Sequence, residues 1–485
     1  MRILMISAEG PPLQRAGALI DVMDALPREL RKRGHQVSVT LPYYREIREK
    51  SKLKAKRTGI AVDVRVGDKT YVADYFEARS AGGVQLFLVR CDDFFDRPGI
   101  YGEQGQPYED NAARFIFFCK AALELARRLT PILQILHVHD WAAALVPVFV
   151  RAHNLPFATL LTIHHIADQG SFWGLDFNLT NLPERFFTLH GVEFFGRLNF
   201  LKGGILYADR ITTVSEHYRR EISRPSGAGG HGLDLVMREN AHRLTAILHG
   251  ADYTRWNPAS DCFLPAQYDG RRLRGKQACR DALLKEMKLA PAPHGPVFGM
   301  VTRVVEEKGF EVLMPLLDRL LWDDVRLIIL GEGDPAYETA LAIAARKFPD
   351  KFAYQKDYDE KLAHLIEAGM DISLIPSRFE PAGLRAMYDL RYGALPAARA
   401  TGGIQEIIED YDPTMDRGYG FLCYEYSSEA FWDAIKRARE TFRNRAIWVK
   451  LMKRAMARNF SWDVSARRYE DVYKELVGAT DEVAA

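Results

Sequence analysis

One acidic residue, Glu380, follows a predicted parallel strand and so lies at the edge of the sheet where ligands usually bind. Glu380 lies in the turn Pro376–Leu384 (PSRFEPAGL), between the apolar run Ile372–Ile375, which predicts a buried parallel strand, and Arg385–Arg391, which predicts a helix. Ligands of open α/β sheets bind at the carboxyl ends of strands. There a helix N-terminus offers N–H groups to phosphate, and a carboxylate can bind a sugar hydroxyl. The turn therefore predicts such a site; the alternative is that Glu380 caps the helix.

Histidines and an aspartate form a second polar group. In the stretch HVHDW, His137 and His139 alternate at strand spacing and so share one face, with Asp140 beside them. A structural zinc site needs four ligands, and the sequence offers no second pair, so we do not predict a metal site here. In TIHHIADQG, a predicted strand brings His164 to the same kind of edge, where the alternative to a functional role is a structural histidine.

Alternating strands and helices must position these groups. Arg2–Ala8 predicts a buried strand, Asp21–Gly34 an amphipathic helix closed by glycine, and Val37–Leu41 the next strand. This βαβ order implies a parallel sheet, and it makes the first loop a strand-to-helix turn like a phosphate-binding one. The same rhythm returns later, where Val297–Val301 and Val325–Leu330 predict strands.

Bulk composition limits the class of protein. A chain of 485 residues exceeds one hydrophobic core, so we expect two domains. The 66 basic and 64 acidic side chains offer no basic field for nucleic acid. Five scattered cysteines without a CxxC pair favour reduced thiols and a cytoplasmic location. The first residues are too short for a signal peptide, and no apolar run reaches the roughly 20 residues of a membrane span.

Three segments in the second half carry a resemblance to a known family. The turn around Glu380, the following Arg391–Gly393 (RYG) and Arg399–Gly403 (RATGG) resemble the bacterial glycogen and starch synthases, glycosyltransferase family 5. The family pattern is PSRFEPCGLxQxYxxRYG and then RATGGL. The resemblance runs from Met1 to about Tyr473 and includes the HVHDW and TIHHIADQG segments.

The resemblance implies a GT-B fold, which is α/β with two doubly wound Rossmann-like domains facing a cleft. A starch-synthase-like domain would cover residues 1–248 and include a crossover helix, 460–485; a nucleotide-sugar-binding domain would cover 249–459. The implied reaction moves glucose from ADP-glucose to the non-reducing 4-hydroxyl end of an α-1,4-glucan, with retention. Nucleotide sugar and glucan (glycogen or malto-oligosaccharide) are then the partners, and neither a metal nor another cofactor is expected.

The same resemblance assigns roles to residues. Cations would stabilise the diphosphate leaving group as it gains charge, which is the role implied for Arg303 and Lys308, otherwise an ordinary surface pair. Three residues would hold the glucosyl group and form the catalytic set: His164, Glu380 and Asp140. The implied donor-binding set is Arg15, Gly17, Asp21, Arg303, Lys308, Tyr358, Gly383, Leu384, Thr401 and Gly402, with Tyr358 as a stacking surface for the base.

Departures from the family pattern keep two other functions open. In the first loop Arg15, Ala16 and Ala18 replace Lys, Thr and Gly, and Ala18 would be strained by on the order of 1 kcal/mol if its φ were positive. Arg385 is expected to add a cation near the phosphates, and His249 replaces an Asn. The alternatives are a divergent paralogue that binds glucan with little catalysis and a retaining transferase for another nucleotide sugar. Oligomeric state, donor nucleotide and acceptor chain length stay unpredicted.

Overall fold

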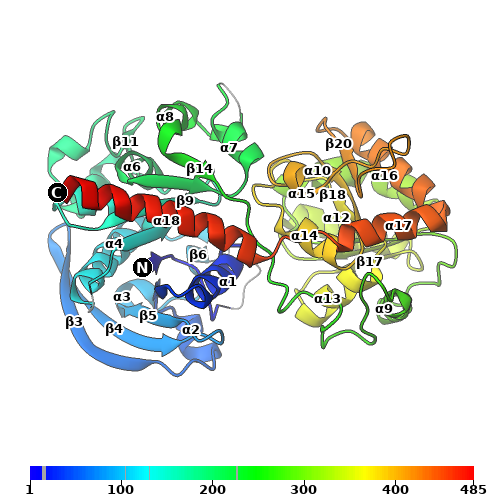
Figure 1. Ribbon diagram of the computed structural model, residues 1–485, viewed down its shortest axis with the longest axis horizontal. Coiled ribbons are helices and arrows are strands. Elements are labelled where there is room, and N and C mark those ends of the chain that lie inside the picture. The colour runs from blue at the N-terminus through cyan, green and yellow to red at the C-terminus, as the bar shows by residue number, and fades with distance from the viewer. Residues whose placement is uncertain (14–17, 104, 130–131, 226–227, 485) are drawn as a thin grey trace. The chain divides into compact units, whose positions relative to one another are not determined.

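The computed structural model describes residues 1–13, 18–103, 105–129, 132–225 and 228–484. The chain forms two compact units (Figure 1). Unit 1 contains Met1–Gly250 and Trp462–Ala485, and unit 2 contains Ala251–Ser461. The sequence placed these boundaries at residues 248 and 459.

Unit 1 is built on a nine-stranded sheet with the order β14-β13-β9-β8-β1-β2-β5-β4-β3. The strands from β14 to β5 are parallel, and β4 and β3 add an antiparallel hairpin at one edge. The predicted βαβ unit is present as β1 (Arg2–Ile6), α1 (Ala18–Lys32) and β2 (Gln36–Pro42). The remaining strands of this sheet are β3 (Lys56–Val66), β4 (Lys69–Arg79), β5 (Gln85–Arg90), β8 (Ile135–His139), β9 (Ala158–Ile163), β13 (Arg210–Thr213) and β14 (Leu244–Ala246).

Unit 2 is built on a six-stranded sheet, β17-β16-β15-β18-β19-β20, in which every pairing is parallel. The predicted strands Val297–Val301 and Ile372–Ile375 are β15 and β18. The prediction Val325–Leu330 corresponds to β16 (Arg326–Leu330), and the helix predicted from Arg385 is α14 (Leu384–Arg391). The other strands are β17 (Phe352–Gln355), β19 (Leu395–Arg399) and β20 (Phe421–Cys423).

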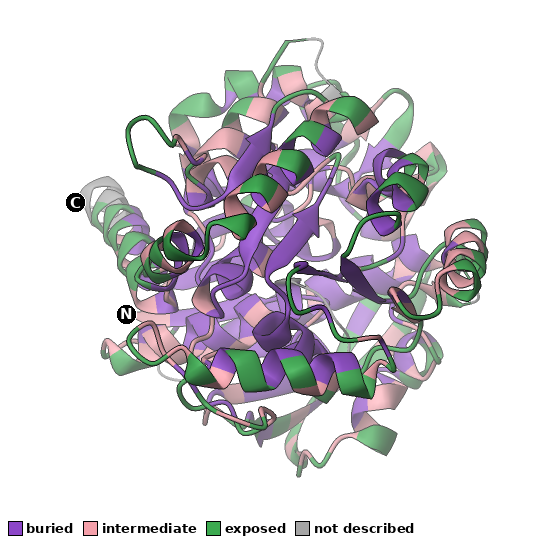
Figure 2. Ribbon diagram, turned by 90° about the vertical axis from the view of Figure 1, so that its right-hand side faces the viewer, coloured by how far each residue is buried: buried purple, intermediate pink, exposed green. Residues whose placement is uncertain are grey.

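Helices cover both sheets, which explains why the central strands are continuous apolar runs. A parallel strand buried on both faces needs no polar alternation, and β15, β16 and β18 are buried throughout. Figure 2 shows the buried strands enclosed by helices with exposed outer faces. The predicted fold class, α/β with two doubly wound sheets, is confirmed.

The helices of unit 1, besides α1, are α2 (Arg45–Lys50), α3 (Asp92–Phe95), α4 (Asn111–Arg128), α5 (Leu145–Ala152), α6 (Phe200–Tyr207), α7 (Glu216–Ile222), α8 (Asp234–Glu239) and α18 (Trp462–Ala484). Helix α18 is the last in the chain and packs against α1, β8 and β9. Short strands lie outside the main sheet: β6 (Gly102–Glu103), β7 (Gln106–Pro107), β10 (Ser171–Phe172), β11 (Glu193–Phe194) and β12 (Arg197–Asn199).

The helices of unit 2, besides α14, are α9 (Arg274–Glu286), α10 (Phe310–Leu313), α11 (Leu317–Leu321), α12 (Pro335–Lys347), α13 (Glu360–Gly369), α15 (Ile404–Ile407), α16 (Ser428–Arg443) and α17 (Arg445–Met456). Across the described part of the chain, no helix has the length and apolar character to cross a membrane. The five cysteines are free thiols, and Cys262 is the exposed one.

Strand order identifies where ligands are expected in each sheet. In unit 1 the order reverses between β1 and β8, and in unit 2 it reverses between β15 and β18. Such a switch point opens a crevice at the carboxyl ends of the two strands, because their loops leave toward opposite faces. Most predicted site residues follow one of these four strands in the sequence. The exceptions are His164 after β9, Tyr358 after β17, and Thr401 and Gly402 after β19.

Candidate active site

Asp140 organises the switch point of unit 1. It follows β8 directly and has a positive φ of 54°, a conformation that is uncommon for a residue with a side chain. Its N–H donates to the Thr162 carbonyl (3.0 Å), and its Oδ1 accepts the His164 N–H (2.7 Å). The carboxylate therefore ties the end of β8 to the loop that follows β9, and it fixes the backbone of His164.

The carboxyl group of Asp140 is also shifted toward protonation. Although the residue as a whole is only half-buried, burial of the carboxyl group raises its pKa to about 7. The hydrogen bond from the His164 N–H acts in the opposite direction. This carboxyl group can therefore change protonation state near neutral pH.

Four histidines form a buried row beside Asp140. His139 Nδ1 and His164 Nε2 share a hydrogen bond of 3.0 Å, and the His137 ring centroid lies 4.1 Å from that of His139. His137 is bonded on both sides, to the Tyr473 hydroxyl (2.8 Å) and to Thr162 Oγ1 (2.6 Å). At the other end, the His249 ring centroid lies 5.0 Å from that of His164.

The row is uncharged at neutral pH. Burial lowers the pKa of His137, His139 and His164 well below the ordinary value, and it lowers that of His249 to about 3. His164 is 7% exposed and His249 is 2% exposed. Within the described ranges, His164 Nδ1, His139 Nε2 and both ring nitrogens of His249 have no hydrogen-bond partner. The row thus offers neutral donors and acceptors.

The histidines do not form a metal centre. Among the residues that the structure describes, no group of three or more His, Cys, Asp or Glu side chains has a geometry that could hold a metal ion. Within the row, His139 and His164 share a hydrogen bond, and His137 bonds to two hydroxyls.

The structure describes only part of the loop between β1 and α1. Arg15, Gly17 and Ala16 lie outside the described residues. Asp21 is half-buried in the first turn of α1. Helix α1 begins at Ala18, so this residue adopts a right-handed helical backbone, and the strain expected for a positive φ does not arise. The condition for strain, a positive φ at Ala18, is not met because the helix starts earlier than the sequence indicated.

Two residues of the loop that follows His164 contact each other. His165 Nδ1 lies 3.3 Å from Asp168 Oδ2, three residues further along the same loop. Asp168 is exposed, whereas His165 is half-buried. The two residues form a local pair on the loop that follows His164.

In unit 2, Glu380 is held by a lysine and a serine. Lys308 Nζ lies 2.8 Å from Glu380 Oε2, and Ser377 Oγ donates to the same oxygen (3.1 Å). Both charged side chains are largely buried. Helix α14 is preceded by Gly383 (φ 71°) and has no side-chain cap, so the alternative in which Glu380 caps this helix is wrong.

Glycines allow three loops to pack closely around this turn. A Cβ on Gly402 (φ 46°) would overlap the Glu380 carbonyl, and one on Gly309 (φ 81°) would overlap the Pro376 carbonyl. Gly403 N–H donates to the Glu380 carbonyl (3.0 Å). Only glycine permits both the positive φ and this close approach. The loops after β15 and β19 therefore fix the backbone that carries Glu380.

The other predicted donor-binding residues of unit 2 differ in exposure. Thr401 and Leu384 are buried, and Leu384 is the first residue of α14. Arg303 has a side chain that is 61% exposed, with a weak contact to Glu307 (3.7 Å), and Tyr358 is 41% exposed. The cation and the aromatic ring are thus accessible to a ligand, whereas the buried residues shape the loops.

Arg385 does not supply the expected free cation. Its Nη1 lies 3.0 Å from Glu367 Oε1, and Glu367 is fully buried. The guanidinium also lies over the rings of Trp256 (5.2 Å) and Tyr388 (5.9 Å). A buried carboxylate in the interior of unit 2 therefore already balances the charge of Arg385, and its contribution to phosphate binding stays a prediction.

Sequence reasoning missed two features of these half-sites. Ser377 was read as part of the turn and not as a partner of Glu380, although a serine three residues before a carboxylate in a turn is a usable signal. The row from His137 to His249 was missed because its members come from separate segments. For a ligand, unit 1 thus offers neutral polar groups, and unit 2 offers a paired lysine and carboxylate.

Comparisons with known proteins assign both halves of the chain. The sequence profile of the starch synthase catalytic domain matches residues 2–239, and that of the group 1 glycosyl transferases matches residues 285–450. A glycogen synthase of Koribacter versatilis is 39% identical over 482 residues, which are 98% of each chain. A glycogen synthase of Anaeromyxobacter sp. is 42% identical over 483 residues, covering 98% of this chain and 99% of that protein.

Solved structures agree. The catalytic domain of starch synthase IV from Arabidopsis thaliana, bound to ADP and acarbose, superposes with a TM-score of 0.91 at 30% identity; the match covers 98% of this chain and 99% of that one. The sucrose-phosphate synthase of Thermosynechococcus elongatus shares the fold at 16% identity, with a TM-score of 0.65.

Proposed function

The chain belongs to the glycogen and starch synthases, a family of glycosyltransferases, and on that premise we propose that it moves glucose from ADP-glucose to the non-reducing 4-hydroxyl end of an α-1,4-glucan, with retention. The observation that carries the proposal is the Lys308–Glu380 pair at the switch point of unit 2. In this pair, Lys308 is the cation proposed to bind the diphosphate, and Glu380 is the carboxylate proposed to bind the sugar. The ADP and acarbose in the Arabidopsis relative fit the same reaction.

Lys308 and Arg303 stabilise the leaving group in this proposal. As the glycosidic bond to the diphosphate breaks, the terminal phosphate gains negative charge, and fixed cations lower the free energy of that state. Lys308 is already positioned by Glu380 before any ligand binds, so little reorganisation is needed. The N–H groups of Gly383 and Leu384 open α14 and add donors of fixed direction.

Glu380, His164 and Asp140 are the residues proposed to hold the glucosyl group. The Glu380 carboxylate accepts from Ser377 and Lys308, and its Oε1 is the oxygen left to accept a sugar hydroxyl. His164 and Asp140 offer further polar groups, and the neutral imidazole of His164 can bind hydroxyls without adding charge beside a cationic transition state. Tyr358 is proposed to stack on the base of the nucleotide.

The proposed reaction uses no metal and no cofactor other than its nucleotide-sugar substrate. Lysine and arginine take the place that a divalent ion occupies in many phosphate sites. We also propose a cytoplasmic location, because free cysteines fit a reducing compartment.

Turnover with two donors tests the proposal. ADP and UDP release from ADP-glucose and UDP-glucose should be measured with and without glycogen, in the presence of EDTA. We expect glycogen-dependent ADP release that EDTA leaves unchanged. Faster turnover of UDP-glucose would favour the transferase for another nucleotide sugar, and glycogen binding without release of either nucleotide would favour the non-catalytic paralogue. A rate lost in EDTA and restored by a divalent ion would refute the metal-free step.

A further inference from the structure

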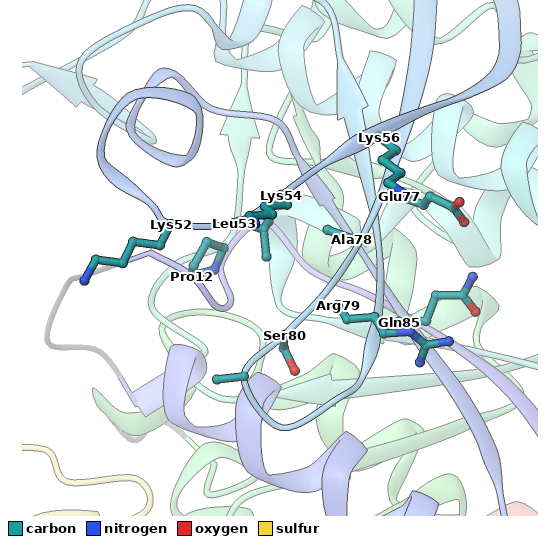
Figure 3. A pocket seen from close by; sticks show the side chains of 11 residues that line it. Pro12, Lys52, Leu53, Lys54, Lys56, Glu77, Ala78, Arg79, Ser80 and Gln85 are labelled. Carbon is teal, nitrogen blue, oxygen red and sulfur yellow. The ribbon is translucent and has the colours of Figure 1, made fainter.

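A pocket of about 670 Å³ in unit 1 does not combine its charges into one site. Its lining comes from Pro12 and from residues within 52–56 and 77–85 (Figure 3). The side chains of Lys52 and Arg79 point in different directions, so the pocket presents separate surface charges (Figure 3). A charge with a fixed position is found in unit 2 instead, at Arg385.

Arg385 is held by an acidic pair in the interior of unit 2. It lies in the first turn of α14, and its Nη1 is 3.0 Å from Oε1 of Glu367 on α13. Glu367 and Asp389 are both fully buried. Burial, and then the neighbouring Glu367 carboxylate, raise the pKa of Asp389 and favour its protonated form. Glu367 is therefore the charged partner that fixes Arg385.

Aromatic rings fix the guanidinium from another side. It lies 5.2 Å from the ring centroid of Trp256 and 5.9 Å from that of Tyr388, and these two rings stack with centroids 4.8 Å apart. Both rings are buried, whereas the Arg385 side chain is 29% exposed. Among the described residues, the guanidinium donates a hydrogen bond to Glu367 alone. Because a guanidinium carries several N–H donors, others are available to a ligand.

Two neighbours of Arg385 have proposed roles in binding the donor. Leu384 precedes it and opens α14, whose first N–H groups are proposed to bind the diphosphate. Tyr358, proposed to stack on the base, is 41% exposed and acts on the guanidinium: burial lowers the pKa of Arg385, but Glu367 and then Tyr358 raise it. Arg385 therefore starts beside the phosphate-binding N–H groups and carries its charge near Tyr358.

The covalent order of a nucleotide determines which part of it meets Arg385. A ribose joins the diphosphate to the base, so a nucleotide whose ends lie at Leu384 and Tyr358 has its ribose beside Arg385. The hydroxyl oxygens of a ribose accept hydrogen bonds, and a guanidinium can only donate them, so the two groups match.

We propose that Arg385 is a further donor-binding residue, which Glu367 positions and which donates hydrogen bonds to the ribose hydroxyl oxygens of the nucleotide. This inference rests on the proposed function, because that function places the diphosphate at α14 and the base on Tyr358. A carboxylate and two rings hold the guanidinium before a ligand binds, so little conformational entropy is lost on binding. The family pattern PSRFEPCGLxQ leaves position 385 open, so this contact is not part of that pattern.

Isothermal titration calorimetry on the full chain tests the contact with ADP and with 2′,3′-dideoxy-ADP, which lacks both ribose hydroxyls. The wild-type chain should bind ADP roughly fivefold more tightly than the analogue, since hydrogen bonds contribute factors of this order. The variant Arg385→Met/Glu367→Gln removes both charges together and so leaves neither of them buried without a partner. It should bind ADP roughly fivefold more weakly, and its preference for ADP over the analogue should fall at least threefold.

A matched control uses another arginine of unit 2 that pairs with a glutamate and lies over a tryptophan ring. Arg319 lies 3.4 Å from Glu429 and 4.3 Å from the ring centroid of Trp432. Arg319→Met/Glu429→Gln should change ADP affinity and the ribose preference less than about twofold. Thermal melts identify a temperature at which all variants are folded.

Glu367→Gln alone tests the positioning role, because it keeps Arg385 and removes its charged partner. The ribose preference should fall about twofold, since the guanidinium is no longer held in one place. Affinity for pyrophosphate, which has no ribose, should stay within about twofold, a result that general destabilisation of the site does not predict. An unchanged ribose preference would contradict the positioning role of Glu367.

Lys308→Ala separates this inference from the proposed function, because its loss of ADP and pyrophosphate affinity tests the diphosphate site alone. The inference is overturned if the wild-type chain binds ADP and the dideoxy analogue alike, a comparison that needs no variant to fold. It is also overturned if Arg385→Met/Glu367→Gln keeps the wild-type preference, or loses pyrophosphate and ADP affinity equally, which would indicate a phosphate contact. A wild-type chain that does not bind ADP at millimolar concentration would reject the proposed function and this inference with it.

Discussion

The two units present the same kind of sheet edge with opposite chemistry. Unit 1 ends its central strands in Asp140 and a row of buried, neutral histidines, whereas unit 2 surrounds its switch point with charged pairs such as Lys308–Glu380. Both edges arise from doubly wound parallel sheets, so the fold supplies the position in each case. The chemistry is set by the few residues that follow each strand.

This contrast implies a division of labour. Neutral imidazoles suit the hydroxyls of a sugar, because they bind without adding charge, and paired cations suit a diphosphate. The positive charges of unit 2 are also balanced before a ligand binds, since Glu380 pairs with Lys308 and Glu367 pairs with Arg385. The predictions below test this division, beginning with the largest expected effect.

Glu380→Gln should lower kcat by roughly a thousandfold, because it removes the charge that positions Lys308 and that we propose contacts the glucosyl group. The melting temperature should also fall, because Lys308 is largely buried and loses its charge partner, so kcat has to be compared at a temperature where both proteins are folded. Initial rates with ADP-glucose and glycogen measure the effect, with Glu440→Gln on the exposed face of α16 as control. A kcat close to that of the wild type would remove Glu380 from the catalytic set.

His164→Ala should lower kcat by about a hundredfold. The change removes a neutral imidazole from the edge that we propose binds the sugar, and it leaves His139 without its ring partner. His153→Ala, at the exposed end of α5, is the matched control and should retain activity. Equal rates for the two variants would mean that His164 is only a structural residue.

Acidification should destabilise unit 1 more than unit 2. Four imidazoles have folded-state pKa values below the unfolded value of about 6.5, so the unfolded chain binds more protons below that pH. Between pH 7 and 5.5 each costs roughly 1 kcal/mol of unfolding free energy. Asp140 acts in the opposite direction, because its raised pKa lets the folded state bind a proton as the pH falls; this offsets roughly 1–2 kcal/mol.

Hydrogen exchange resolves this effect by unit. Amides of β8 and β9 should exchange faster at pH 5.5 than at pH 7 after correction for the intrinsic rate, while those of β15 and β18 change less. His249→Asn removes one of the four rings and should reduce the net pH dependence by roughly one third to one half, since Asp140 offsets part of the histidine contribution. If β15 and β18 lose as much protection as β8 and β9, the histidine row is not the cause.

Ala18→Gly should have the smallest effect, with the KM for ADP-glucose within twofold of the wild type. Because α1 begins at Ala18, a glycine relieves no backbone strain there and costs at most about 1 kcal/mol of helix stability. A KM several-fold lower would show that the loop adopts a different conformation when the donor is bound.

Sequence reasoning succeeded where one local pattern decided the structure. The run Ile372–Ile375 gave a strand with the predicted bounds, because a strand buried on both faces must be apolar throughout. Sequence reasoning failed where contacts between segments distant in the sequence determine the structure. The histidine row depends on β8 lying beside β9 and on His249 packing near both, which spacing in one chain does not reveal. Arg385 turned inward because buried Glu367 lies on another helix, α13.

ADP affinity measured by calorimetry on two single variants tests the division of labour most directly. Lys308→Ala should weaken ADP binding at least tenfold, because it removes a buried cation from the diphosphate site. His164→Ala should leave ADP affinity within twofold, because ADP lacks the glucosyl group that this residue is proposed to hold. If His164→Ala weakens ADP binding as much as Lys308→Ala does, or if Lys308→Ala has no effect, the assignment of His164 to the sugar and Lys308 to the diphosphate is contradicted.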